Sequence, residues 1–375
     1  MKIIVSPDSF KGSCSAIEVA NSIEKAIYDV DRTVDVVKMP VADGGEGTID
    51  AITSCVPSTI YEMEICDPMG KRAMAKYAVI DNGDTAIIEM AQASGLPMVP
   101  VEERNPLLAT TYGTGQLMKY ALDKGVKKMI IGIGGSATND GGAGMLMALG
   151  ASFRNIKGEE IALGGAALAE LVEIDLSEFD SRIFDVDITV ACDVTNPLTG
   201  ANGASYVYGP QKGATPEMVA ELDAALEHFA KLSAKELGED YSKYPGTGAA
   251  GGLGFALIAY CKAKFAAGID IVLNVSGFEK ELEDTDLVIT GEGRIDGQSA
   301  QGKVLYGIGT RAKEAGVPVI AIGGAVRSDS EALLNHGITA MFSIANGPMT
   351  LEYAMEHGCE LIEQVTKNVM RVFLH

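Results

Sequence analysis

Short apolar runs followed by helix-like segments occur at both ends of this chain, and this alternation is what most limits its fold. Residues 3–5 and 34–37 are two such runs, with helices expected at 15–28 and 48–55. The pattern returns at residues 287–289, 317–322 and 339–344. Alternating strands and helices are typical of a parallel sheet covered by helices. We therefore expect a flavodoxin-like sheet with the strand order 2-1-3-4-5.

A different pattern fills the middle of the chain. Residues 59–65, 73–80 and 85–90 alternate in polarity, and turn sequences separate them, which predicts an antiparallel meander. Helices are expected at 112–122, 216–237 and 253–265, and a further strand at 187–191. The fold class is therefore α/β. We predict a flavodoxin-like (Rossmann-like) domain made of residues 1–58 and 283–375, split by an inserted α/β domain of residues 59–282 that contains the meander.

Composition excludes several classes of function. The net charge of −21 disfavours nucleic-acid binding, which needs a basic face, and equally disfavours anionic membranes. The six cysteines form no C-x-x-C pair, so we expect reduced, buried thiols. The four histidines lie far from the glycine-rich loops, which argues against a histidine triad or metal cluster. With neither a signal peptide nor an apolar stretch of ~20 residues, we expect a cytoplasmic protein that acts on small molecules.

Many of the 44 glycines gather in loops between strands and helices. The loop at 132–145 is the richest, and its Asp140-Gly-Gly-Ala-Gly144 repeats the pattern of Asp43-Gly-Gly-Glu-Gly47. A carboxylate beside bare backbone amides suits magnesium and phosphate together, while the alternative is an aspartate that caps the next helix. We expect the 132–145 loop to line a cleft between the two domains and to bind ligand through Gly134, Gly135, Ser136, Asn139 and Gly142.

Open parallel sheets bind ligands beyond the carboxyl ends of their strands, where the strand order reverses. The loop after the first strand supplies Asp8, Ser9 and Lys11 to this point. The expected loop 291–303 after the third strand supplies four more polar candidates, Glu292, Arg294, Asp296 and Lys303. Acids for a hard cation, amides for phosphate and a few basic side chains are what phosphoryl transfer requires.

The place of each candidate residue in the predicted loops suggests its role. Asp296 is predicted as the general base because it neighbours Arg294, which could grip a substrate carboxylate; the alternative is that Asp296 caps the following helix. Lys11 supplies positive charge. Asp43, Asp193 and Asp140 are the predicted magnesium ligands. Further contacts to substrate or nucleotide are assigned to Asp8, Ser9, Gly45, Asn196, Glu292 and Lys303.

Two glycine patterns resemble known nucleotide loops without matching them. Residues 297–303 read G-x-x-x-x-G-K, but Val304 stands where a P-loop needs Ser or Thr, so we reject a P-loop and keep an anion site. Residues 246–251 read G-x-G-x-x-G without a preceding strand, so a Rossmann fingerprint is disfavoured. An anion nest and plain tight packing both remain open there.

Six motifs, spread in order from residue 7 to residue 296, resemble those of the type I bacterial glycerate kinases. They are Pro7-Asp-Ser-Phe-Lys-Gly12, Ala42-Asp-Gly-Gly-Glu-Gly-Thr48, Gly134-Gly-Ser-Ala-Thr-Asn-Asp-Gly-Gly142, Ala191-Cys-Asp-Val-Thr-Asn-Pro-Leu198, Gly209-Pro-Gln-Lys-Gly213 and Thr290-Gly-Glu-Gly-Arg-Ile-Asp296. The resemblance implies an ATP- and Mg²⁺-dependent phosphotransferase that acts on a hydroxyl of D-glycerate. It also implies an active site between the two domains. The 2-phosphoglycerate product is favoured, and 3-phosphoglycerate stays open.

Other functions compete with this interpretation. A non-catalytic nucleotide or organic-acid binding protein could use the same residues, and so could a kinase of another small hydroxy acid. A dehydrogenase is favoured only by residues 246–251. The oligomeric state cannot be predicted from these patterns.

Overall fold

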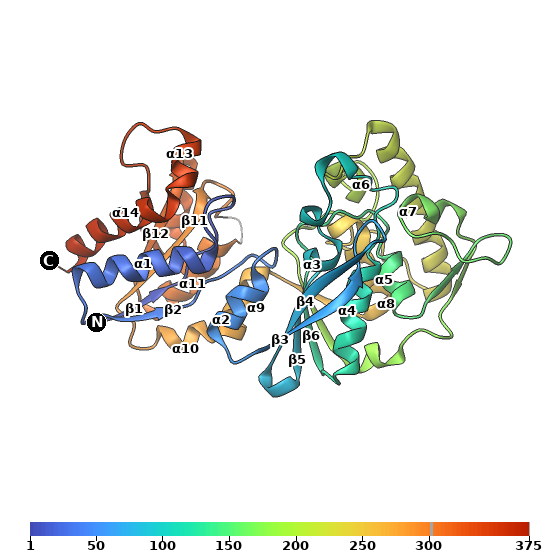
Figure 1. Ribbon diagram of the computed structural model, residues 1–375, viewed down its shortest axis with the longest axis horizontal. Coiled ribbons are helices and arrows are strands. Elements are labelled where there is room, and N and C mark those ends of the chain that lie inside the picture. The colour runs from blue at the N-terminus through green and yellow to red at the C-terminus, as the bar shows by residue number, and fades with distance from the viewer. Residues whose placement is uncertain (301–302, 375) are drawn as a thin grey trace. The chain divides into compact units, whose positions relative to one another are not determined.

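The computed structural model describes residues 1–300 and 303–374 and divides into two compact units (Figure 1). The first unit combines Met1–Pro57 with Ala267–His375, and the second is Ser58–Ala266. The second unit ends at Ala266, whereas the sequence predicts an insertion that ends at residue 282. The reason is packing within the first unit, where Ile269 fills the space beside Gly307 and Arg311 pairs with Asp270 at 3.0 Å.

A parallel sheet forms the centre of the first unit, in the order β13-β12-β11-β1-β2. When the five strands of this unit are numbered 1 to 5 along the chain and the sheet is read from β2, the order is 2-1-3-4-5. The flavodoxin-like prediction is therefore confirmed. The inner strands are apolar and buried because helices cover both faces of such a sheet. The strands are β1 (Lys2–Val5), β2 (Asp35–Lys38), β11 (Leu287–Ile295), β12 (Val319–Val326) and β13 (Ile338–Ser343).

Eight α-helices accompany this sheet among the described residues. Helix α1 begins at a capping box formed by Ser15 and Glu18, and it lies beside α14 (Figure 1). Both helices contribute apolar side chains to the core around β1, β11 and β12. The helices are α1 (Ala16–Val30), α2 (Thr48–Cys55), α9 (Gly268–Ser276), α10 (Phe278–Leu282), α11 (Val304–Ala315), α12 (Ala332–Asn335), α13 (Leu351–Glu356) and α14 (Gly358–Phe373).

Strand β11 is longer than its sequence suggests. The prediction places a strand at 287–289 and a loop from 291, but β11 runs to Ile295 and stays paired with β12 as far as the Ile295–Val326 match. Pairing with a neighbour thus overrides the weak strand propensity of two glycines. Because side chains two residues apart share one face of a strand, Glu292 and Arg294 point the same way.

A six-stranded mixed sheet forms the centre of the second unit, in the order β10-β9-β6-β5-β4-β3. Strands β3, β4 and β5 pair antiparallel, which confirms the meander, and β5, β6, β9 and β10 pair parallel. Two short strands, β7 and β8, make a separate antiparallel pair. The strands are β3 (Thr59–Cys66), β4 (Arg72–Ile80), β5 (Thr85–Glu89), β6 (Lys128–Gly132), β7 (Ser152–Arg154), β8 (Glu173–Asp175), β9 (Asp187–Ala191) and β10 (Lys264–Ala266).

The helices predicted at 112–122, 216–237 and 253–265 are all present, and the last of them is shorter than predicted. Helix α7 matches its predicted range, between a Thr215 cap and Gly238 in the left-handed conformation. The helix expected over 253–265 stops at Cys261 because Lys262 turns left-handed, and the following residues form edge strand β10. The helices are α3 (Ala91–Ser94), α4 (Tyr112–Asp123), α5 (Ala143–Ala148), α6 (Ala204–Tyr208), α7 (Pro216–Leu237) and α8 (Leu253–Cys261).

None of the helices in residues 1–300 and 303–374 combines the length and the apolar character needed to cross a membrane.

Candidate functional site

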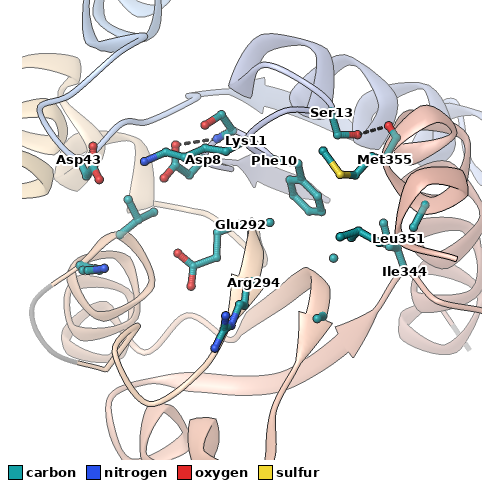
Figure 2. Close-up of a pocket in the computed structure, with 17 residues that line it drawn as sticks. Asp8, Phe10, Lys11, Ser13, Asp43, Glu292, Arg294, Ile344, Leu351 and Met355 are labelled. Carbon is teal, nitrogen blue, oxygen red and sulfur yellow. Dashed lines mark hydrogen bonds between the residues drawn. The ribbon is translucent and has the colours of Figure 1, made fainter. Parts of the chain in front are cut away.

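A pocket of about 530 Å³ lies in the first unit at the carboxyl ends of β1 and β11, the neighbouring strands at which the order of the sheet reverses. One half is charged and the other half is apolar, as Figure 2 shows. The polar lining is Asp8, Ser9, Lys11, Ser13, Asp43, Glu292, Arg294 and Lys303. The apolar lining includes Phe10, Val304, Ala325, Ile344, Leu351, Ala354 and Met355.

Asp8 lies where the loop after β1 passes beside β11. Its backbone N–H donates to the carbonyl of Gly291 at 2.8 Å, and its carboxylate accepts the N–H of Ser9 at 2.6 Å. Burial and the nearby charge of Asp43 raise the pKa of Asp8 to about 7, although Lys11 acts in the opposite direction. This carboxyl group therefore exchanges its proton near neutral pH.

Glu292 projects from β11 into the charged half of the pocket (Figure 2). Its carboxylate accepts a hydrogen bond from the hydroxyl of Ser299. Burial raises the pKa of Glu292, while the Ser299 hydrogen bond and the charge of Lys303 lower it. Lys303 occupies the N-cap position of α11, so its side chain starts at the rim of the pocket.

Arg294 and Asp296 form an ion pair with 2.9 Å between Nε and Oδ2. The Arg294 side chain is 60% exposed and lines the pocket, whereas Asp296 is 15% exposed and is absent from the lining. Asp296 also accepts the N–H of Gln298 at 2.9 Å. It therefore holds Arg294 and the 296–299 turn, and the N-cap of the following helix α11 is Lys303 rather than Asp296.

Asp43 lines the pocket from the loop after β2. Its Oδ1 accepts the N–H of Gly45 at 3.2 Å, and the residue at the N-cap of α2 is Gly47. The aspartate is half-buried and near enough to Asp8 and Glu292 to raise both of their pKa values. The described residues hold no cluster of three or more side chains that could bind a metal by themselves.

The glycine-rich loop at 132–145 is a structural element of the second unit. Asp140 is fully buried, and its carboxylate accepts hydrogen bonds from Thr111 N–H at 2.8 Å, Thr111 Oγ1 at 2.9 Å and Gly142 N–H at 3.1 Å. Gly144 N–H donates at 3.3 Å as well. These hydrogen bonds and the burial of Asp140 favour a role in holding the loop, and the magnesium role stays a prediction.

Lys212 was not among the predicted site residues, yet it is the most unusual group near this loop. Its side chain is fully buried, and its Nζ donates to Ser136 Oγ at 2.8 Å and to the carbonyl of Thr138 at 2.6 Å. Burial lowers the pKa of Lys212 to about 7. The signal in the sequence was Gly209-Pro-Gln-Lys-Gly213, a lysine enclosed by turn residues.

The other candidates in the second unit differ in burial and in hydrogen bonding. Asn139 is buried; its Nδ2 donates to Ser205 Oγ at 2.9 Å, while its Oδ1 has no hydrogen-bond partner among the described residues. Asn196 contacts Asn202 and Tyr208 at 2.8 and 2.7 Å. Gly142 is buried as well, whereas Gly134 is half-exposed and Gly135 exposed. Asp193 is exposed just beyond the end of β9.

The two glycine patterns, residues 246–251 and 297–303, have different outcomes in the structure. Within residues 246–251, a Cβ at Gly251 would collide with the carbonyl of Thr138, which favours tight packing over an anion nest. In the 297–303 pattern, the glycine at position 302 lies outside the described residues.

Comparison with known proteins gives one consistent family. Residues 3–374 match the model of the glycerate kinase family. A glycerate kinase of Bacillus subtilis (strain 168) is 50% identical, over 98% of this chain and 97% of its own length, and a glycerate 2-kinase of Escherichia coli (strain K12) is 47% identical over the same shares. A crystal structure of a provisionally named glycerate kinase 2 from Salmonella typhimurium LT2 is similar with a TM-score of 0.89 at 48% identity, covering 100% of this chain and 98% of that one.

The packing of Gly142 predicts that the 132–145 loop controls stability. Gly142 has φ +80°, and a Cβ there would collide with that of Ala256, so Gly142→Ala is both strained and overpacked. Gly158 has φ +77° with no atom within 4 Å, so Gly158→Ala is a control that carries the strain alone. We expect Gly142→Ala to lose about 1–3 kcal/mol more than the control in denaturant unfolding. Equal losses, or a raised KM with normal stability, would contradict this and favour a ligand-binding loop.

Proposed function

We propose, because this chain belongs to the glycerate kinase family, that it transfers the γ-phosphate of ATP to a hydroxyl group of D-glycerate. The observation that carries the proposal is the pocket of the first unit, where a carboxyl group with a pKa of about 7 lies among basic side chains at the reversal of the strand order. The 2-hydroxyl is the favoured acceptor, since one relative is named for that position.

The two halves of the pocket suit two parts of the substrates. Its volume of about 530 Å³ falls within the usual range for small-molecule sites, roughly 300–1,000 Å³. Glycerate carries a carboxylate and two hydroxyls but no apolar group that could pack against Phe10, Ile344 and Leu351. A flat aromatic base can pack there. We therefore place the adenine of ATP against the apolar half of the pocket and its phosphates toward the charged half.

The basic side chains divide by geometry. Lys11 and Lys303 are compact charges at the pocket and suit the phosphates of ATP. Arg294 uses Nε in its ion pair with Asp296, and its terminal nitrogens form the fork that binds a carboxylate with two hydrogen bonds. We assign the carboxylate of glycerate to this fork, which makes Asp296 a positioning residue for Arg294.

Asp8 is our choice for the general base in place of the Asp296 that the sequence suggested. A base works best when its pKa is near the working pH, and that of Asp8 is about 7. Asp8 also lines the pocket, whereas Asp296 is occupied by Arg294 and Gln298. Asp8 would take the proton of the attacking hydroxyl group, and Ser9 N–H fixes the orientation of its carboxylate.

The charged half also fits a magnesium ion. Magnesium in kinases is usually held by one or two carboxylates together with substrate phosphates and water, so a complete protein cage is not required. Asp43 is the half-buried carboxylate that fits this need, with Glu292 as the second candidate. The ion would neutralise charge on the phosphates. Asp193 stays a predicted magnesium ligand.

An assay of ADP release tests the proposed activity. The full chain, incubated with MgATP and D-glycerate, is expected to release ADP, and phosphorus NMR of the product identifies the phosphorylated hydroxyl. Glycolate, lactate and tartronate in parallel reactions show whether another hydroxy acid is preferred. No ADP release with any of them would favour a non-catalytic binding protein. Binding of NAD instead of ATP would favour a dehydrogenase.

The position of Asp8 predicts the pH dependence of turnover. Asp8 must be deprotonated to accept a proton, so kcat/KM should fall as the pH decreases below about 7. Asp8→Asn should lower kcat by roughly 10² or more and remove that limb of the pH profile. Asp296→Asn is the matched control and should mainly raise the KM for glycerate through Arg294. The roles are exchanged if Asp296→Asn shows the large kcat loss and Asp8→Asn does not.

The apolar half of the pocket predicts a selective effect on ATP. Leu351→Asp places a carboxylate in that half and should raise the KM for ATP tenfold or more, about 1.4 kcal/mol, while sparing the KM for glycerate. Val372→Asp serves as control, because Val372 is an exposed residue of α14 that does not line the pocket. A higher KM for glycerate with that for ATP unchanged would reverse the assignment of the two halves.

A further inference from the structure

Two cysteines from opposite ends of the sequence meet inside the first unit. The Sγ atoms of Cys14 and Cys359 are 2.6 Å apart, and both residues are free thiols. Cys14 is 6% exposed and follows a tight turn, while Cys359 is half-buried in the first turn of α14. The proposed reaction uses neither side chain, so this contact needs an explanation of its own.

The backbone around the two thiols is held firmly. Phe10 N–H donates to the carbonyl of Cys14 at 2.8 Å, and Cys14 N–H donates back to Phe10 at 3.0 Å. The hydroxyl of Ser13 donates to the carbonyl of Met355 at 2.6 Å. A Cβ at Gly358 would collide with Ser13 Oγ, so glycine there allows the turn and α14 to approach closely. These contacts hold the two backbone segments that carry the cysteines close together.

We propose that Cys14 and Cys359 are a modification site that forms a reversible intramolecular disulfide, with a low-molecular-weight disulfide as the oxidant. Cys359 is the more exposed thiol and reacts first. Its thiolate attacks one sulfur of the oxidant, giving a mixed disulfide and releasing one thiolate, which takes up a proton. The thiolate of Cys14 then attacks Sγ of Cys359 and releases the second thiolate. Both cysteines are oxidised, and the oxidant is reduced to two thiols.

The environment of Cys359 affects how fast the disulfide forms. Burial and the neighbouring Cys14 raise the pKa of Cys359 to about 11. Since the thiolate is the nucleophile, oxidation is slow at neutral pH and accelerates as the pH rises toward that value.

A disulfide between Cys14 and Cys359 would strongly affect the stability of the first unit. Cys14 lies in the N-terminal segment of the first unit and Cys359 in its C-terminal segment, 345 residues apart in the chain. The backbone that joins these two segments runs through the whole second unit. A disulfide would close this long loop directly, and crosslinks that close long loops restrict the unfolded chain most. Unfolding of the first unit should therefore become harder.

Incubation of the full chain with oxidised glutathione at pH 8.5 tests the proposal. We expect a peptide map that joins the segments around residues 14 and 359, a monomer on a non-reducing gel, and a Tm raised by about 5 °C or more. Dithiothreitol should reverse all three effects. Cys14→Ser and Cys359→Ser should each abolish the crosslink and the Tm increase, while Cys55→Ser, which removes another half-buried thiol, should keep both.

Two results would overturn the proposal. One is a stable glutathione adduct at Cys359 without a 14–359 crosslink in the folded wild-type chain. The other is an equal Tm increase in Cys14→Ser, which would place the effect elsewhere. If a serine variant folds poorly, Cys14→Ala provides the same comparison with a smaller, apolar side chain. Activity with ATP and glycerate is not needed for any of these measurements, so they stand apart from the proposed function.

Discussion

The parallel pairing of β1 with β11 is the interaction on which the candidate site depends. Ile3, Ile4 and Val5 match Leu287, Val288 and Ile289 across the centre of the sheet. Hydrogen bonds continue beyond the strand, from Ser6 N–H to Ile289 and from Asp8 N–H to Gly291, both at 2.8 Å. This extension carries the loop with Asp8 and Lys11 alongside Glu292 and Arg294. Residues from the two ends of the chain therefore line one pocket because the apolar strands β1 and β11 pair with each other inside the sheet.

The two D-G-G-x-G loops show how burial assigns different roles to one local structure. In each loop the aspartate Oδ1 accepts the N–H two residues ahead, at 3.2 Å for Asp43 and 3.1 Å for Asp140. Asp43 remains half-buried at a pocket, whereas Asp140 is enclosed and accepts several further donors. A short motif specifies the turn, but the packing around it decides whether the carboxylate can meet a ligand.

The periodicity of the sequence predicted most of the fold, whereas the remaining features depend on contacts between residues distant in the sequence. The strand order and the meander follow from short apolar runs and alternation, both of which are local. The strand character of residues 291–295 depends on pairing with β12, which no local pattern contains. The choice between Asp8 and Asp296 depends on neighbouring charges and on an ion pair. Buried Lys212 is harder still to foresee, because lysine rarely leaves water.

The split of the first unit also bears on how the chain is made. Strands β1 and β2 leave the ribosome early, but β1 cannot pair with β11 until the intervening Ser58–Ala266 has been translated. At typical synthesis rates that delay is on the order of ten seconds or more. The second unit is continuous and can fold during this interval, while the first segment waits with an apolar strand edge unpaired. We therefore expect the N-terminal segment, rather than the larger unit, to be the part of the nascent chain that is open to aggregation in this interval.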